Sequence, residues 1–211
     1  VTMGSCAENQ RLKHGCIVMA SGMGTRFGAN KLMAVLEGKP LIQHVAETVR
    51  GLFDELVVVT RSDEVARLCR SLVVAVILHS EPHRNDTVRL GMEAIAAVCD
   101  TVTFMQGDQP LISARSIQEL LAHADDDPSS IWRVAFEGTP GAPVLFPAWT
   151  FDELCALPQS KGGGYVAKAH RERVRTVEVT SSWELFDVDT QEDLLVLEEH
   201  VSAVDLGSMF V

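Results

Sequence analysis

Short apolar runs alternate with segments of helical periodicity in the first part of the chain. The runs are rich in β-branched residues and have the length of strands that are buried on both faces. They predict strands at 15–20, 56–60, 73–78 and 102–105. The segments between them repeat apolar residues every three or four positions, which predicts helices at 40–52, 62–70, 86–99 and 112–123. Such alternation indicates an α/β fold, in which helices cover both faces of a mainly parallel sheet.

The later part of the chain continues this pattern with shorter elements. Further strands are predicted at 130–136, 144–146, 174–179 and 184–188. Helices are predicted near 150–157 and 163–170, and Thr190 is placed to cap a last helix that ends near His200. The segment 125–130, D-D-D-P-S-S, has the composition of a solvated turn.

The composition suits one globular domain. The chain has 211 residues, of which 46% are hydrophobic, and this is enough for a sizeable core. We find no internal repeat and no long linker, and we expect a disordered arm at 1–14, the folded domain at 15–200 and a tail at 201–211. No stretch reaches the roughly 18 consecutive apolar residues of a membrane helix. The first fifteen residues lack the apolar core of a secretion signal, so we expect a cytoplasmic protein with no membrane partner.

The charge and the cysteines narrow the possible functions. A net charge of −11 argues against nucleic acid as a partner. The five cysteines include no C-x-x-C pair, so neither a disulfide framework nor a zinc site is indicated. His79 and His83 have the spacing of metal ligands on a helix, but Pro82 between them favours a loop.

The strongest chemical signal is the segment 20–31, A-S-G-M-G-T-R-F-G-A-N-K, which follows the first predicted strand. Its glycines can adopt backbone angles that other residues avoid, and they let main-chain N–H groups approach phosphate oxygens. Arg26 and Lys31 would supply positive charge where negative charge develops in phosphoryl transfer, so we expect both to bind nucleotide and to act in catalysis. Main-chain nucleotide contacts are expected from Ala20, Ser21, Gly22 and Gly24.

The spacing in this segment excludes two common nucleotide-binding loops. A dinucleotide-binding turn needs G-x-G-x-x-G, and here the third glycine comes one residue late. A P-loop needs G-K followed by Ser or Thr, whereas Gly38 and Lys39 are followed by Pro40. An ordinary flexible loop after a strand remains an alternative at this point.

Three aspartates follow predicted strands and are candidate metal ligands. Asp108 lies directly after the fourth strand, while Asp187 and Asp189 lie at the end of the last one. Mg²⁺ in proteins typically takes one or two carboxylates together with phosphates and water. Residues two apart on an extended chain point the same way, so both late aspartates could face one site with Asp108. Their alternatives are a turn cap for Asp108 and a cap of the last helix for Asp189.

Three loops are candidates for further contacts with the nucleotide or with an acceptor. The segment 80–87 precedes a helix whose first N–H groups are free, which favours anions, and Arg84, Asn85 and Thr87 are candidate nucleotide contacts there. Plain capping by Asp86 is the alternative. The glycine-rich segments 138–141 and 161–164 could shape a pocket for an acceptor.

Five segments resemble, in order, the motifs of one family of nucleotidyltransferases, those related to the molybdenum cofactor enzymes. Residues 20–31 are similar to L-A-A-G-x-G-x-R-[MF]-G-x-x-K, and 38–41 to G-[KR]-P-L. Residues 107–110 are similar to G-D-[MQ]-P, 141–146 to G-x-P-[VL]-[LI]-[FL], and 187–193 to D-[IV]-D-T-P-E-D. Five ordered matches over much of the chain carry more weight than any one of them.

Within that family the chain is most similar to the molybdenum cofactor cytidylyltransferases, because D-V-D-T at 187–190 differs from the N-x-N-T of the guanylyltransferases. Ser21 stands where the family usually has Ala, and Gln191 where it usually has Pro. Neither departure removes a charged group.

The resemblance implies a fold, a reaction and partners. The fold would be the single-domain, three-layer nucleotidyltransferase (Rossmann-like) fold with a mostly parallel central sheet. The reaction would transfer CMP from CTP to the phosphate of molybdenum-bearing molybdopterin with release of pyrophosphate, using Mg²⁺. A client molybdoenzyme or its maturation factor would be a further partner. The alternatives are a guanylyltransferase, a sugar- or alcohol-phosphate nucleotidyltransferase, or a non-catalytic carrier of the molybdenum cofactor.

Overall fold

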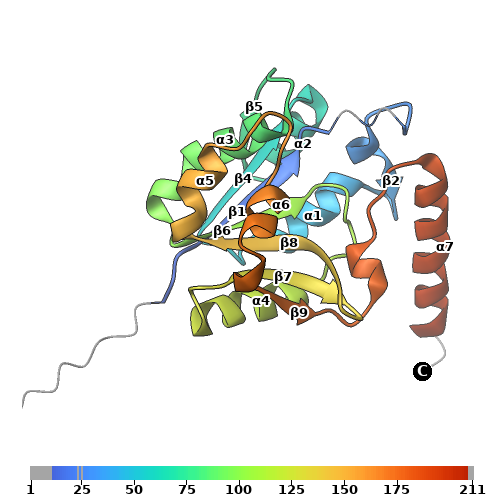
Figure 1. The fold of residues 1–211 in the computed structure, drawn as a ribbon. Coiled ribbons are helices and arrows are strands. Elements are labelled where there is room, and N and C mark those ends of the chain that lie inside the picture. Colours follow the sequence, from blue (N-terminus) through green and yellow to red (C-terminus); the bar gives the residue numbers. More distant parts are fainter. Residues whose placement is uncertain (1–10, 23, 25, 209–211) are drawn as a thin grey trace, which may run out of the picture.

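The computed structural model describes residues 11–22, 24 and 26–208. Its central sheet has seven strands: β1 (His14–Ala20), β4 (Glu55–Thr60), β5 (Ala75–Leu78), β6 (Thr101–Gln106), β7 (Ile131–Phe136), β8 (Thr139–Pro147) and β9 (Val174–Glu178). They lie in the order β5-β4-β1-β6-β8-β7-β9 (Figure 1). Every pair is parallel except that β8 runs antiparallel to both β6 and β7. The predicted single-domain α/β fold with a mostly parallel sheet is confirmed.

Helices cover both faces of this sheet because neighbouring strand residues point to opposite sides. Cys16 and Val18 of β1 belong to one apolar core, and Ile17 between them belongs to the other. The first core lies under α1 (Leu41–Val49), α2 (Asp63–Ser71) and α4 (Ala114–Asp126). The second lies under α3 (Arg84–Ile95), α5 (Phe151–Cys155) and α6 (Gly164–Ala169). These are the three layers of the predicted architecture.

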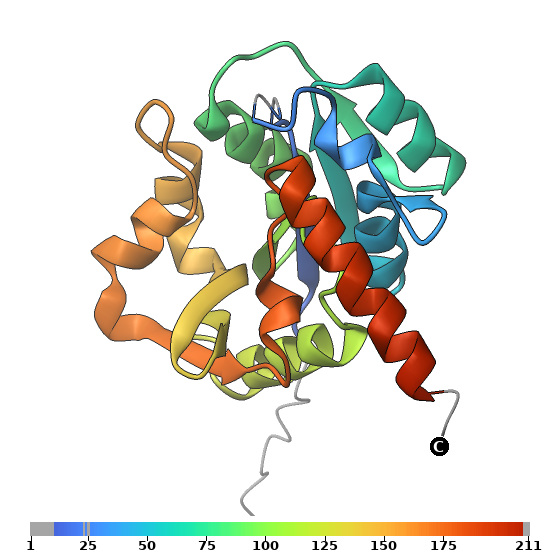
Figure 2. The ribbon, with the colours of Figure 1, turned by 90° about the vertical axis from the view of Figure 1, so that its right-hand side faces the viewer.

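A third, smaller core joins the C-terminal helix to the glycine-rich segment 20–31, called the glycine loop below. Phe27, Leu36, Leu41 and Leu197 are buried together, and Leu197 comes from α7 (Gln191–Ser208). Leu36 belongs to a short hairpin formed by β2 (Val35–Leu36) and β3 (Lys39–Pro40). In Figure 2, α7 runs diagonally across the view beside the N-terminal segments. The last helix therefore packs against the loop that follows the first strand.

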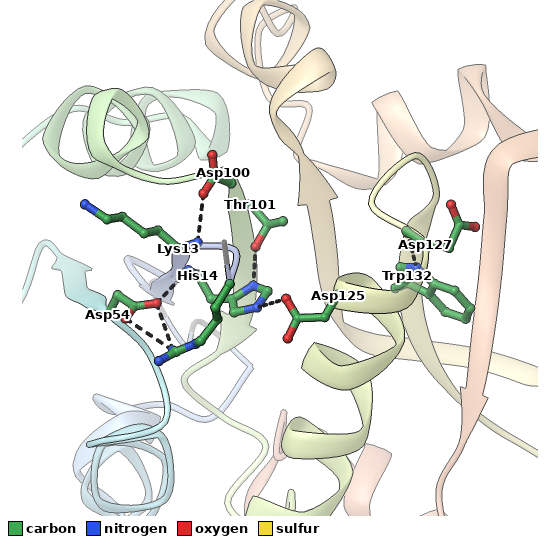
Figure 3. Close-up of polar contacts among 9 residues, drawn as sticks. Lys13, His14, Asp54, Asp100, Thr101, Asp125, Asp127 and Trp132 are labelled. Atoms are coloured by element: carbon green, nitrogen blue, oxygen red, sulfur yellow. Dashed lines mark hydrogen bonds and ion pairs between the residues drawn. The ribbon is translucent and has the colours of Figure 1, made fainter. Parts of the chain in front are cut away.

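The start of the described chain is held against the sheet (Figure 3). The main-chain N–H of Lys13 donates to Asp100 at 2.8 Å, and that of His14 donates to Asp54 at 2.8 Å. The buried imidazole of His14 lies 2.7 Å from the hydroxyl of Thr101 through Nδ1. The end of the predicted arm, at Lys13 and His14, thus contacts the sheet, and the first ten residues of the arm lie outside the described part.

Most predicted elements are present within a few residues, and one is wrong. The expected strand at 184–188 is replaced by the 3₁₀ turn η5 (Ser182–Leu185) and irregular chain. Its apolar residues face different surfaces: Leu185 packs on the first core, whereas Phe186 and Val188 pack on the third. The last helix continues past its predicted end near His200. Shorter 3₁₀ turns are η1 (Lys31–Met33), η2 (Ala96–Val98), η3 (Ala148–Thr150) and η4 (Arg171–Arg173).

Candidate functional site

A cavity of about 750 Å³ opens at the carboxyl ends of the central strands. This is where open α/β sheets bind their ligands. It collects residues from segments far apart in the sequence: the glycine loop, the ends of β4 and β6, the start of α3, and the chain around β7, β8 and η5. Among its lining residues are Ser21, Gly22, Arg26, Lys31, Arg61, Arg84, Thr87, Asp108, Gln109, Arg133, Asp187 and Asp189.

Lys31 is the centre of the charged network in this cavity. Its ammonium donates to Asp108 at 2.6 Å and to Asp189 at 2.7 Å. Arg26 donates to the other oxygen of Asp189, also at 2.6 Å. Burial disfavours the ammonium, but the hydrogen bonds and negative charges of the two aspartates outweigh it and raise the pKa of Lys31. The hydrogen bond from Lys31 in turn lowers the pKa of Asp189.

Asp187 lines the same cavity but takes no part in these ion pairs. Partial burial, followed by the charge of Asp108, raises the pKa of its carboxyl to about 6. Three carboxylates therefore share one cavity, and only two of them contact the Lys31 ammonium. The structure places Asp187 and Asp189 in the same cavity as Asp108, although the extended strand assumed for them is absent.

The glycine loop is shaped by a tight turn that closes between Gly24 and Phe27. Gly24 has φ of +57°, and a Cβ built there would lie 2.8 Å from the carbonyl oxygen of Ala29. The N–H of Phe27 closes the turn on the carbonyl of Gly24 at 2.9 Å. Gly22 lines the cavity, whereas Gly24 supports the turn and does not line it. Ala20 is buried at the end of β1 and borders a smaller adjoining cavity.

Arg61 and His79 hold the first residue of the loop, and the sequence did not single out Arg61. The Nε and Nη2 groups of Arg61 both donate to the carbonyl oxygen of Ser21, at 2.9 and 2.7 Å. The Ser21 hydroxyl donates to the carbonyl of Val59 at 3.1 Å and lies 2.8 Å from Nε2 of His79. Because that hydroxyl has one proton, the imidazole is the donor in the second bond. Burial and the charge of Arg61 lower the pKa of His79, which agrees with a neutral ring.

The predicted contacts on the 80–87 segment divide between the cavity and the scaffold. Arg84 and Thr87 line the cavity. The Thr87 hydroxyl is buried and has no hydrogen-bond partner among the described residues. Asn85 does not line the cavity, and its side chain accepts from the N–H of Ser160 at 2.9 Å. Asp86 accepts from the N–H of His83 at 3.1 Å, as expected of a cap.

The far wall of the cavity adds residues that the sequence pattern did not reveal. Arg133 of β7 donates through Nε and Nη2 to the carbonyl oxygen of Gly141, at 3.0 and 2.8 Å. Gln109 is buried in the wall, and its Oε1 has no partner among the described residues. The predicted acceptor loop at 138–141 borders this wall. Lys161, Gly162 and Gly164 of the K-G-G-G loop border a neighbouring cavity of about 710 Å³, which shares Arg84 with the first.

The donor set of the cavity fits a hard divalent cation. Asp108, Asp187 and Asp189 offer carboxylate oxygens, which Mg²⁺ and Mn²⁺ prefer. In the described part of the chain no three His, Cys, Asp or Glu side chains are gathered closely enough to bind a metal by themselves. One or two carboxylates that share a cation with substrate phosphates and water suit this arrangement. His79 and His83 are engaged with Ser21 and Gln159 instead.

Comparison with known proteins agrees with this geometry. Residues 16–174 match the model of the MobA-like NTP transferase domain. A 3-deoxy-manno-octulosonate cytidylyltransferase of Geobacter metallireducens is 35% identical over 113 residues, covering 53% of this chain and 44% of that protein. The chain thus spans less than half the length of this curated relative.

Solved structures share the fold at lower identity. Rv0371c from Mycobacterium tuberculosis in complex with manganese superposes with a TM-score of 0.75 at 20% identity, covering 89% of this chain and 98% of that one. Molybdopterin-guanine dinucleotide biosynthesis protein A from Archaeoglobus fulgidus gives 0.69 at 20% identity, covering 90% and 99%. No helix in the described residues combines the length and apolar character needed to span a membrane.

Proposed function

Because the chain belongs to the family of MobA-like NTP transferase domains, we propose that it transfers CMP from CTP to a small acceptor and releases pyrophosphate. The observation that carries this proposal is the bridge from Lys31 to Asp108 and Asp189. A basic residue of a glycine loop, a carboxylate just after β6 and a second carboxylate just before α7 are the groups that positioning and charge neutralisation of a triphosphate require.

The roles of the residues follow from their charges. Lys31 and Arg26 would bind phosphate oxygens and stabilise the charge of the departing pyrophosphate. Asp108, with Asp187 or Asp189, would hold Mg²⁺, which when bound neutralises charge on the phosphates. A cation and the Lys31 ammonium compete for the same carboxylates, so metal binding would free Lys31 for the phosphates. Arg61 would position the Ser21–Gly22 peptide through its bonds to the Ser21 carbonyl.

The chain needs no nucleophile of its own in this reaction. The acceptor oxygen would attack the α-phosphorus in line with the leaving pyrophosphate, and the cavity would align the two substrates. Ala20, Ser21 and Gly22 would contact the nucleotide through their main chain. Thr87 offers a buried hydroxyl without a partner among the described residues, and Arg84 and Asn85 complete the proposed nucleotide contacts.

The first candidate acceptor is the phosphate of molybdenum-bearing molybdopterin, which the D-V-D-T motif at 187–190 supports. A second candidate is a sugar acid, because a cytidylyltransferase named for such a substrate is 35% identical over 113 residues. A client molybdoenzyme or its maturation factor would accompany the first acceptor only. A non-catalytic carrier is the remaining alternative, and a site with Lys31, Arg26 and Asp108 intact argues against it.

Pyrophosphate release tests the proposal. The protein with Mg²⁺ is incubated with CTP or GTP and with each candidate acceptor, and pyrophosphate and the nucleotidylated product are measured. We expect turnover with CTP and one acceptor, and weaker turnover with GTP, because a site built to pair with one base leaves its polar groups unpaired with another. Equal or greater incorporation of GMP would overturn the choice of cytidine. Nucleotide binding without turnover for any acceptor would favour a carrier.

A further inference from the structure

Arg133 differs from Arg26 and Lys31, the two cavity cations that the sequence predicted for catalysis. Arg26 and Lys31 are paired with aspartates. Among the described residues, Arg133 has no carboxylate within ion-pair distance, although its side chain is partly buried in the cavity wall. Burial lowers the pKa of its guanidinium. A partly buried charge without a counterion is costly for a protein to maintain, so its presence in a cavity points to an anionic ligand.

The orientation of Arg133 is fixed by the protein. Its Nε and Nη2 groups both donate hydrogen bonds to one oxygen, the carbonyl of Gly141. Leu185 packs closely against Gly141, where an added Cβ would lie 2.9 Å from the Leu185 side chain. These two hydrogen bonds leave the Nη1 group and one Nη2 hydrogen without an acceptor among the described residues. That edge of a guanidinium binds a carboxylate or a phosphate through two parallel hydrogen bonds.

The position of Arg133 favours the acceptor over the nucleotide. It lies on β7, which is three places from β1 in the sheet order. At the usual strand spacing this is roughly 14 Å from the strand that leads into the glycine loop. Lys31 and Arg26 belong to the glycine-loop side, and Arg133 borders the 139–142 segment on the other side. Lys31 and Arg26 therefore lie toward one end of the cavity, and Arg133 lies toward the other.

We propose that Arg133 binds an anionic group of the acceptor, a carboxylate or a phosphate that is separate from the attacking oxygen. The inference rests on the proposed function and narrows its substrate class to acceptors with such a second anion. Gly141 positions the guanidinium. Asp187, one of the three carboxylates in the cavity, would repel the anion if both were charged and close.

Binding of inorganic phosphate and of glycolate to the full chain tests this proposal and distinguishes the two anions. Each probe is titrated at constant ionic strength, with and without a nonhydrolysable CTP analogue and Mg²⁺, and affinity is measured from the rise in melting temperature. With the analogue bound, we expect Arg133→Met to weaken the preferred probe by roughly 10- to 100-fold. The affinity for the analogue itself should change by less than about twofold. Arg133→Lys should restore part of the probe affinity, because it keeps the charge and loses the fork.

Arg175→Met is the matched control. Arg175 is exposed on the neighbouring strand β9, does not line the cavity, and donates to main-chain carbonyls. This variant should bind both probes as the wild type does. If Arg133→Met does not fold, the comparison of wild type with Arg133→Lys carries the test.

Three results would overturn the proposal. The first is that the wild type and the Arg133 variants bind the probes equally well. The second is that the nucleotide-bound wild type binds neither probe. The third is that Arg133→Met weakens the binding of the probe and of the nucleotide analogue equally. The last would assign Arg133 to the triphosphate. Failure of every nucleotide to bind would instead count against the proposed function, and the probe titrations without the analogue would still report on Arg133.

Discussion

At the scale of single residues, Lys31 joins segments from different parts of the chain in one ion-pair network. It follows the glycine loop, yet its partners are Asp108 in the middle of the sequence and Asp189 near its end. The second of these partners lies beyond residues 16–174, the part that matches the family model. A complete site thus depends on a C-terminal segment that the matched region does not include.

Replacing Lys31 should abolish most of the activity while the fold persists. Lys31→Met keeps the buried stem but removes the charge that would stabilise the departing pyrophosphate, and such a loss commonly costs roughly 10²-fold or more in rate. The measurement is kcat for pyrophosphate release. Lys39→Met is the control, because Lys39 pairs with Glu47 at the surface and does not line the cavity. Turnover of the Lys31 variant within about twofold of the control would contradict the assigned role.

The neutral imidazole of His79 should make stability depend on pH. Its pKa is lowered in the folded protein, so the unfolded chain takes up the proton first as the pH falls through the ordinary value of 6.5. Its contribution to stability is therefore full above that pH and decreases below it. Asp187 acts in the opposite sense, because its raised pKa makes the folded state the first to take up a proton.

The comparison of wild type with His79→Gln isolates the histidine. Glutamine can still donate to the Ser21 hydroxyl but does not titrate. The difference in free energy of unfolding between the two proteins, measured by urea denaturation from about pH 7 to about pH 5, should shift in favour of the variant as the pH falls. A difference that stays constant over this range would show that folding does not lower the pKa of His79.

At the scale of elements, α3 approaches β1 more closely than a side chain would allow. A Cβ at Gly91 would lie 2.7 Å from Cγ2 of Ile17 and 2.8 Å from its Cδ1. Overpacking of this kind costs about 1–3 kcal/mol, and the helix propensity of alanine returns up to about 1 kcal/mol. Gly91→Ala should therefore reduce the free energy of unfolding by about 1–2 kcal/mol.

A glycine in α6 provides the matched comparison. A Cβ at Gly164 would meet no atom within 4 Å, so Gly164→Ala should leave the stability unchanged or slightly raised. Chemical denaturation measures both variants. If Gly91→Ala is as stable as Gly164→Ala, the contact between α3 and β1 is looser than described.

The sequence predicts well those elements in which the apolar residues repeat at the period of a helix or a strand. β1 and α3 have apolar residues at the spacing of their secondary structure, so their type follows from local burial alone. The direction of β8 does not, because its apolar run would look the same in either direction. The strand predicted at 184–188 is wrong because the apolar residues of this segment pack on two different cores. Hydrogen bonds from Ser113 and Ser116 to the buried Glu184 connect the segment to α4.

The candidate site was predicted in part for the same reason. Lys31 ends the glycine-rich segment that follows the first strand, and Asp108 follows Gly107 just after β6, so residue type and position together indicate phosphate chemistry. Arg133 and Arg61 carry no such local signal, because an arginine within or after a strand is usually solvated. Their importance comes from partners that folding brings near, the carbonyls of Gly141 and Ser21.

At the scale of the whole molecule, the net charge of −11 opposes the binding of a triphosphate. Cationic side chains in the cavity offset this repulsion locally. Two of them, Lys31 and Arg26, are however already neutralised by Asp108 and Asp189. Binding of CTP alone must separate these ion pairs and leave the carboxylates next to the phosphates. A divalent cation compensates the same carboxylates and the phosphates together. Nucleotide and metal should therefore bind as strongly coupled ligands.

This coupling can be measured from thermal unfolding. At about 100 times its dissociation constant a ligand stabilises the folded state by roughly 2.7 kcal/mol, and for a chain of this size that corresponds to a rise in Tm of roughly 5–10 °C. We expect such a rise for CTP with Mg²⁺, and a much smaller one for the same CTP with a chelator. Asp108→Asn should remove the metal-dependent part, because the amide keeps the shape of the carboxylate and loses its charge. An equal rise in Tm with and without the metal, or an unchanged Mg²⁺ titration in Asp108→Asn, would place the cation elsewhere and leave Lys31 paired with its aspartates during nucleotide binding.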